Sequence, residues 1–119
     1  MLSPSVGHKG QLADITLAIG AINREKMHLT VELDSGYELR MARGRSLIRL
    51  SLVHDDREIE QRKCSDSDLR AIGQGARRSL FQGTLQFRRR RKTIWIHVAG
   101  TPVTSLPAQL LDVALDLLP

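Results

Sequence analysis

Three consecutive runs in which apolar and polar residues alternate constrain the fold of this chain more than any other feature. They cover residues 29–33, 37–41 and 48–52, and in each run every second side chain is Leu, Ile, Val, Met or Tyr. A period of two is typical of strands with one buried face. Turn-forming residues separate the runs, at 34–36 and 43–45. We therefore predict an antiparallel meander of three strands with one apolar face.

Helical periodicity is found on both sides of this meander. Apolar residues from Leu12 to Ile22 recur at a spacing that lines one face of a helix, which predicts a first helix there. A second helix is predicted from Ser65 to Leu80, because Ser65 and Asp68 have the spacing of a capping box. Two glycines interrupt this second helix and would let another backbone approach closely, Gly73 and Gly75.

The remaining C-terminal residues predict a hairpin followed by a helix. Residues 84–87 and 94–98 alternate like strands, and a basic run lies near the tip between them. The last helix is expected to begin at Ser105 and to reach Leu118. It is apolar on most sides, so that the sheet or another subunit must cover it. The other two segments are predicted as loops, residues 54–63 and 101–106.

These elements predict an α+β fold in the order α-β-β-β-α-β-β-α, with an antiparallel sheet packed on helices. A chain of 119 residues with 41% hydrophobic residues fits one domain, over residues 10–119. Residues 1–9 lack a periodic pattern and are expected to form a flexible tail. Aromatic residues make up only 3% of the chain, so the core must be mainly aliphatic.

The sequence shows no sign of catalytic or metal chemistry. The single cysteine, Cys64, indicates a reducing compartment, and we expect a cytoplasmic protein because no signal peptide or membrane span is recognisable. The histidines and Cys64 do not have the spacing of metal ligands, and no nucleophile stands beside a base. We therefore expect a binding module without cofactor or metal rather than an enzyme.

The net charge of +5 is unevenly distributed along the chain. Between Asp68 and Asp112 the sequence contains no acidic residue. The same interval contains a basic cluster. Such a cluster can bind the phosphates of a nucleic acid, can bind an acidic protein surface, or can protect an edge strand from aggregation. The sequence leaves these three interpretations open. The candidate basic patch consists of Arg77, Arg78, Arg88, Arg89, Arg90, Arg91 and Lys92.

The element order, and the C-terminal half in particular, resembles the small chaperones of bacterial type III secretion systems. The resemblance is carried by residues 69–83, the strand segments 84–87 and 93–98, the loop at 103–106 and the helix that follows. It implies a homodimer or a chaperone-like heterodimer. Such a protein would hold an extended segment of an effector, or a regulatory partner as in chaperone-like members of Hrp systems.

The resemblance also implies two apolar surfaces. An extended client would lie across the first helix and the meander and would add a strand to a sheet edge. The implied client-binding residues are Leu12, Ile15, Ile19, Leu29, Val31 and Leu33, for which plain core packing is the alternative. By the same analogy, Leu80, Leu85 and Phe87 would form the subunit interface. The function that the resemblance implies is protein binding, and the alternative is nucleic-acid binding by the hairpin with Arg88–Lys92.

Overall fold

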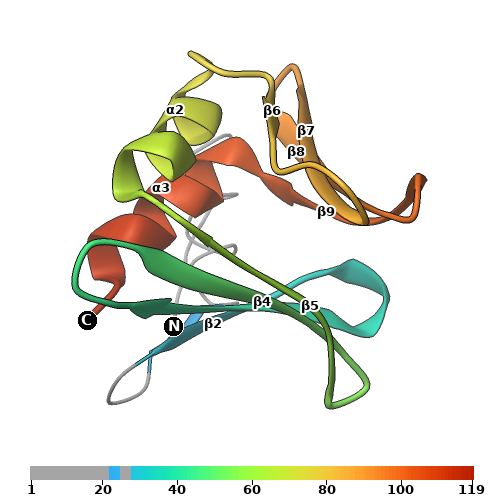
Figure 1. The fold of residues 1–119 in the computed structure, drawn as a ribbon, viewed down its shortest axis with the longest axis horizontal. Coiled ribbons are helices and arrows are strands. Elements are labelled where there is room, and N and C mark those ends of the chain that lie inside the picture. The colour runs from blue at the N-terminus through green and yellow to red at the C-terminus, as the bar shows by residue number, and fades with distance from the viewer. Residues whose placement is uncertain (1–21, 25–27) are drawn as a thin grey trace, which may run out of the picture.

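The computed structural model describes residues 22–24 and 28–119, which form two antiparallel sheets and two helices (Figure 1). The first sheet contains, in spatial order, β1 (Ile22–Arg24), β2 (Leu29–Glu32), β3 (Tyr37–Arg43), β4 (Ile48–His54) and β5 (Arg57–Cys64). The second contains β6 (Ser79–Leu80), β7 (Leu85–Arg90), β8 (Thr93–Val98) and β9 (Thr101–Pro107). The helices are α2 (Asp66–Gln74) and α3 (Ala108–Leu117). The predicted α+β class is confirmed.

The predicted meander is confirmed as β2, β3 and β4, joined by a 3-10 turn (η2, Asp34–Gly36) and a short loop. Val31 faces Leu39, and Leu39 faces Leu52, so the alternating apolar side chains share one buried face. Most of the predicted first helix lies outside the described residues. Its last position, Ile22, belongs instead to β1, where it faces Val31.

The predicted loop over residues 54–63 is wrong, because residues 57–64 form the edge strand β5. Asp55 and Asp56 have φ angles of 52° and 65° and make the tight turn that returns the chain from β4. Two successive positive φ angles give a turn whose twist matches that of the flanking strands. Only Cys64 of β5 is buried. Charged residues are common on edge strands because they prevent pairing with other molecules, and this polarity concealed the strand.

The second helix begins as predicted but ends earlier. The Ser65 hydroxyl accepts a hydrogen bond from the Asp68 amide at 3.1 Å, which confirms the predicted cap. The helix stops at Gln74 because Gly75 adopts the left-handed conformation, with φ of 87°, that commonly ends helices. The predicted extension to Leu80 is therefore wrong, and Leu80 lies in β6.

The predicted loop over residues 101–106 is also wrong, because this segment forms β9 at the edge of the second sheet. Proline is tolerated in an edge strand when its nitrogen faces away from the neighbouring strand, which accommodates Pro102 and Pro107. Ser105 belongs to β9, so the last helix begins at Ala108 and not at Ser105. The Ala108 amide donates a hydrogen bond to the Lys92 carbonyl at 2.9 Å, which ties the helix to the β7–β8 turn.

The inner faces of both sheets and the two helices enclose one core, with the helices together at one end of the molecule (Figure 1). Helix α3 is covered by this chain itself, since Leu110, Leu111, Ala114 and Leu115 are buried in that core. None of the helices in the described residues is long and apolar enough to cross a membrane.

Several residues expected to contact a client or a second subunit belong to this core instead. Leu29, Val31 and Phe87 are 0% exposed, and Leu80 and Leu85 are buried beside them. In this fold these five side chains are not available to a partner, because the apolar face of each strand packs against the helices and the other sheet. Leu33 is half-buried. The other three expected client contacts lie outside the described residues, Leu12, Ile15 and Ile19.

Helices α2 and α3 pack closely at Gly73, as the glycine pattern predicts. A Cβ at this position would lie 2.9 Å from Asp112 Oδ1 and 3.6 Å from the Ala108 carbonyl oxygen. Arg70 joins the two helices through an ion pair between its Nη2 and Asp116 Oδ1 at 2.8 Å. Burial raises the pKa of Asp112, because Arg70 at 3.9 Å only partly compensates the lost hydration. A side chain at position 73 would therefore force the Asp112 carboxylate to move, whereas its contact with the α3 backbone would be an ordinary one.

Candidate functional site

The outer face of the second sheet presents basic and polar side chains to solvent. Side chains alternate between the two faces of a strand. Because Leu85 and Phe87 point into the core, Gln86, Arg88 and Arg90 of β7 point outward. The same parity turns two residues of β8 outward, Trp95 and His97.

Strand register brings these outward side chains into cross-strand rows. Arg88 lies between Ser79 of β6 and Trp95 of β8, and Trp95 in turn faces Ser105 of β9. In the next row, His97 faces Gln86 on one side and Pro102 on the other. Directly opposed side chains on one face are close enough to act together on a ligand.

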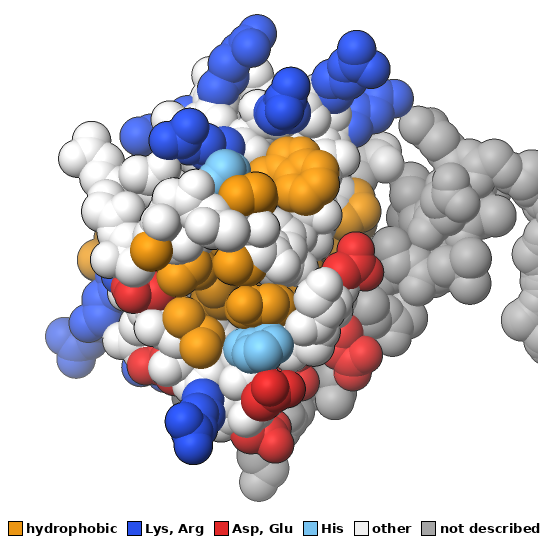
Figure 2. Space-filling model, turned by 90° about the vertical axis from the view of Figure 1, so that its right-hand side faces the viewer, with side chains coloured by type: hydrophobic (Ala, Val, Ile, Leu, Met, Phe, Trp, Pro, Cys, Tyr) orange, Lys and Arg blue, Asp and Glu red, His pale blue; other side chains and the backbone are white. Residues whose placement is uncertain are grey.

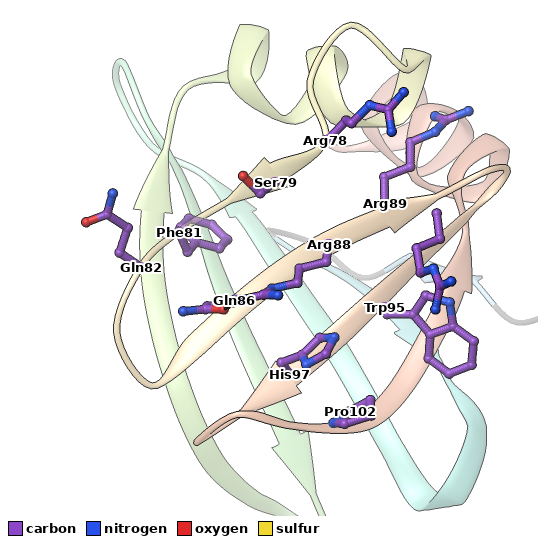
Figure 3. A pocket seen from close by; sticks show the side chains of 11 residues that line it. Arg78, Ser79, Phe81, Gln82, Gln86, Arg88, Arg89, Trp95, His97 and Pro102 are labelled. Atoms are coloured by element: carbon purple, nitrogen blue, oxygen red, sulfur yellow. Dashed lines mark hydrogen bonds between the residues drawn. The ribbon is translucent and has the colours of Figure 1, made fainter.

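These rows form the floor of an open groove of about 800 Å³. Figure 3 shows Arg88 lying along the sheet toward Gln86, with Trp95, His97 and Pro102 to one side and Phe81 to the other. No carboxylate is among the described residues that line it. The lining consists of Arg78, Ser79, Phe81, Gln82, Gln86, Arg88, Arg89, Arg90, Trp95, His97 and Pro102.

Three arginines of this groove have no acidic partner in the part of the chain that the structure describes. Arg88 donates two hydrogen bonds to the amide oxygen of Gln86, at 2.7 and 3.1 Å, which hold its guanidinium against the sheet without neutralising it. Arg78 and Arg90 are exposed and make no side-chain hydrogen bond or ion pair with a described residue. All three charges are therefore available to an anion.

Arg89 has a different role from its two neighbours, although the sequence run does not distinguish it. It lies on the inner side of β7 and its Nη1 donates to the carbonyl oxygens of Ile72 and Gly73, at 2.9 and 2.7 Å. Its Nε donates to the Arg91 carbonyl at 2.7 Å. The last carbonyls of a helix lack intrahelical partners and carry partial negative charge, so Arg89 caps the C-terminus of α2.

The other members of the predicted basic patch lie at the ends of the groove or outside it. Arg77 pairs with Asp68 at 3.2 Å and donates to the Ser79 carbonyl at 2.8 Å, which makes it part of the local structure. Arg91 and Lys92 are exposed in the β7–β8 turn. The structure thus divides the predicted patch into a groove, a helix cap and a hairpin tip.

Trp95 is the only tryptophan of the chain, and its side chain is 39% exposed. It is the one aromatic residue among the large hydrophobic side chains that the described part of the chain leaves exposed, the others being Leu47 and Ile59. Its neighbour across the strands is Arg88. An exposed ring beside an unneutralised guanidinium can stack on a flat apolar group while the charge contacts an anion.

Charge is segregated over this side of the molecule. Figure 2 shows most of the Lys and Arg side chains along one edge, most of the Asp and Glu side chains toward the opposite edge together with a few further cations, and hydrophobic side chains between the two edges. The segregation follows from the sequence, since the whole second sheet lies within the interval that contains no acidic residue. The positive potential over the groove is therefore not locally compensated.

The described residues show neither a metal site nor an activated cysteine. Among them no group of three His, Cys, Asp or Glu side chains is placed to hold a metal ion. Cys64 is buried at the end of β5, and burial raises the pKa of its thiol to about 12, with the negative charge of Asp68 adding to the effect. A thiol with such a high pKa is protonated at neutral pH and is a poor nucleophile.

Several groove residues were not among the predicted site residues, notably Gln86, Trp95 and His97. The strand parity would have identified them, because continuing the alternation from Leu85 and Phe87 places every even position of β7 on the outer face. Phe81 and Pro102 are brought to the groove by β6 and β9, which the sequence did not predict.

No family model, curated protein or solved structure matches this chain.

Proposed function

We propose that this protein binds single-stranded nucleic acid along the outer face of its second sheet. The observation that carries the proposal is the acid-free groove, in which Arg78, Arg88 and Arg90 line the same surface as the exposed ring of Trp95. Proteins that bind single strands combine a positively charged groove with aromatic side chains on which bases stack. Sheet faces that present such rings serve this purpose in several folds.

The groove geometry favours a single strand over a duplex. Arg88 and Trp95 lie directly opposite each other on adjacent strands, on the floor of the open groove. A base stacked on Trp95 therefore places its own phosphate within reach of Arg88. In a duplex the bases are already stacked on one another, so that Trp95 would gain no contact with them and only the arginines would contribute.

The proposal is tested by removing two groove charges. We expect Arg88→Ser together with Arg90→Ser to weaken binding of a fluorescent oligothymidylate about tenfold or more at low salt, because each lost contact is a charge-assisted one. The slope of log affinity against log salt should also fall by about 1.4, which is two contacts at about 0.7 each. Fluorescence anisotropy at several salt concentrations measures both quantities.

The matched control removes the same formal charge from the first sheet. In the variant Arg40→Ser with Arg57→Ser, one arginine was already paired with Glu38 at 3.1 Å and the other is the exposed first residue of β5. It should leave affinity and slope almost unchanged. An equal loss in both variants would mean that binding follows net charge and not the groove, and would overturn the proposal.

A second prediction isolates the stacking contact. We expect Trp95→Ala to weaken oligothymidylate binding about 5- to 150-fold, the range that corresponds to the loss of one stacked base. Trp95→Phe should retain most of the affinity, since a phenyl ring still stacks. In the unmodified protein the only tryptophan lies in the groove, so quenching of its fluorescence should follow saturation. If the alanine variant bound normally, the bases would not contact this face.

Protein binding, which the resemblance to secretion chaperones implies, is the second proposal. The hydrophobic side chains between the basic and acidic edges in Figure 2 favour it, because an extended apolar segment would cover them. The two proposals differ in their response to salt. Burial of apolar surface is little affected between about 50 and 200 mM salt, whereas binding through phosphates weakens steeply in that range.

A further inference from the structure

A second basic surface lies on the first sheet, at the β3–β4 turn. Four cationic side chains line a hollow of about 290 Å³ there, without a carboxylate among the described residues that surround it. All four are exposed, and one exposed apolar side chain, Leu47, lies between them. The cations of this turn cluster are Arg43, Arg45, Arg49 and Lys63.

The charges of the turn cluster are uncompensated, in contrast to other arginines of the same sheet. Arg40 pairs with Glu38 at 3.1 Å, and Arg62 pairs with Glu60 at 2.8 Å. None of the four turn cations has a side-chain hydrogen bond or ion pair with any residue in the described ranges. Arg49 and Lys63 even face each other across β4 and β5, an arrangement of like charges that destabilises a sheet. A bound anion would relieve this repulsion.

The turn cluster and the groove point away from each other. Ile48, Leu50 and Cys64 face the core, so Arg49 and Lys63 project from the outer face of the first sheet. The groove lies on the outer face of the second sheet, and the shared core separates the two sheets. A short strand seated on Trp95 therefore cannot reach the turn cluster. Anions at the two surfaces must belong to different segments.

We propose that the turn cluster is a second phosphate-binding site, so that one molecule of this protein bridges two nucleic-acid segments. This inference rests on the proposed function of the groove. The turn cluster contacts only the phosphate backbone, because its described lining contains no aromatic ring on which a base could stack. Its binding is accordingly weaker than that of the groove and more easily lost with salt.

A nucleic acid suits the turn cluster better than an anionic membrane. Peripheral binding to a bilayer requires apolar surface that inserts below the headgroups, in addition to positive charge. Leu47 is the only large exposed apolar side chain in this hollow, and it is 43% exposed. One leucine provides little insertion, whereas four adjacent cations without a carboxylate among them suit the phosphates of a nucleic-acid backbone.

Bridging is measured with two oligothymidylates, which cannot pair with each other. One is biotinylated and held on beads, the other carries a fluorophore, and the protein is added at about 50 mM salt. We expect recovery of the fluorescent strand with the unmodified protein. Arg45→Ser with Arg49→Ser should reduce this recovery at least about tenfold. Titration of Trp95 fluorescence reports the groove alone, and its midpoint should stay within about twofold.

The outcomes separate this inference from the function on which it rests. If Arg45→Ser with Arg49→Ser still bridges, the two strands are held by two grooves of a dimer, and the second site is overturned while the groove stands. If no oligothymidylate quenches Trp95, the proposed function itself fails. The control variant Arg57→Ser, at an exposed position outside the lining of both surfaces, should bridge normally. Loss of binding to phosphatidylserine vesicles in the turn variant, with bridging intact, would assign the turn cluster to membranes and overturn the inference.

Discussion

Replacing Phe87 by alanine should lower the free energy of unfolding by about 3–5 kcal/mol, the usual cost of deleting a buried aromatic ring. Phe87 is 0% exposed, and its ring meets that of Phe81 edge to face, with centroids 5.2 Å apart. It lies in β7, between β6 and β8, where both sheets and the helices converge. The alanine variant would also lose this ring contact with Phe81.

Urea denaturation followed by circular dichroism measures this loss. Phe87→Leu is the matched variant, and it should cost less because it keeps most of the apolar volume. The same experiment decides between the core position and the subunit interface that the secretion-chaperone resemblance implies. If Phe87→Ala converted a dimer to a monomer by light scattering without lowering the stability of the monomer, Phe87 would belong to an interface and not to the core.

Arg89→Ser should cost about 2–3 kcal/mol of stability, whereas Arg88→Ser, one position earlier, should change it by less than about 0.5 kcal/mol. Arg89 makes three hydrogen bonds to carbonyl oxygens, two of them at the end of α2. Its removal leaves the Ile72 and Gly73 carbonyls without this donor and takes a positive charge from the negative end of the helix. Arg88 bonds only to the exposed amide of Gln86.

The binding of oligothymidylate should show the opposite order. Arg88→Ser should weaken binding, while Arg89→Ser should leave binding by the folded fraction largely intact. The variant with the larger effect on binding is therefore the one with the smaller effect on stability. Arg89→Lys should restore only part of the stability, because an ammonium group lacks the planar fork that reaches two sites at once. Equal effects of Arg88→Ser and Arg89→Ser on stability would refute the distinction between helix cap and groove.

The meander and the β7–β8 hairpin could be predicted because alternation is a local property of the sequence. The strands β5 and β9 could not be predicted, because each lies at a sheet edge. An edge strand pairs with a neighbour on one side only, so charged residues and prolines that would disrupt a central strand are tolerated there. Charged side chains in β5 and two prolines in β9 are acceptable only at such an edge. Edge position is a property of the whole fold, and no short window of sequence reveals it.

The candidate site was predicted as a basic patch, but without the groove residues Gln86, Trp95 and His97. Alternation from Leu85 and Phe87 already determines that Arg88 and Arg90 point outward and Arg89 inward. What the sequence does not contain is the position of the α2 C-terminus, which gives Arg89 its partners. Likewise, an apolar strand face is equally expected in a core and in an interface, so Leu29 and Val31 could be assigned only once the fold was known.

The prolines of β9 limit how copies of this protein can associate with each other on one polyanion. Pro102 and Pro107 lack amide donors, and both lie in β9, the edge strand of the sheet that carries the groove. A neighbouring copy therefore cannot continue the hydrogen-bond ladder of that sheet along its full length. Molecules concentrated side by side on a long strand would stay separate folded units, where an unprotected edge would let them fuse into a continuous aggregate.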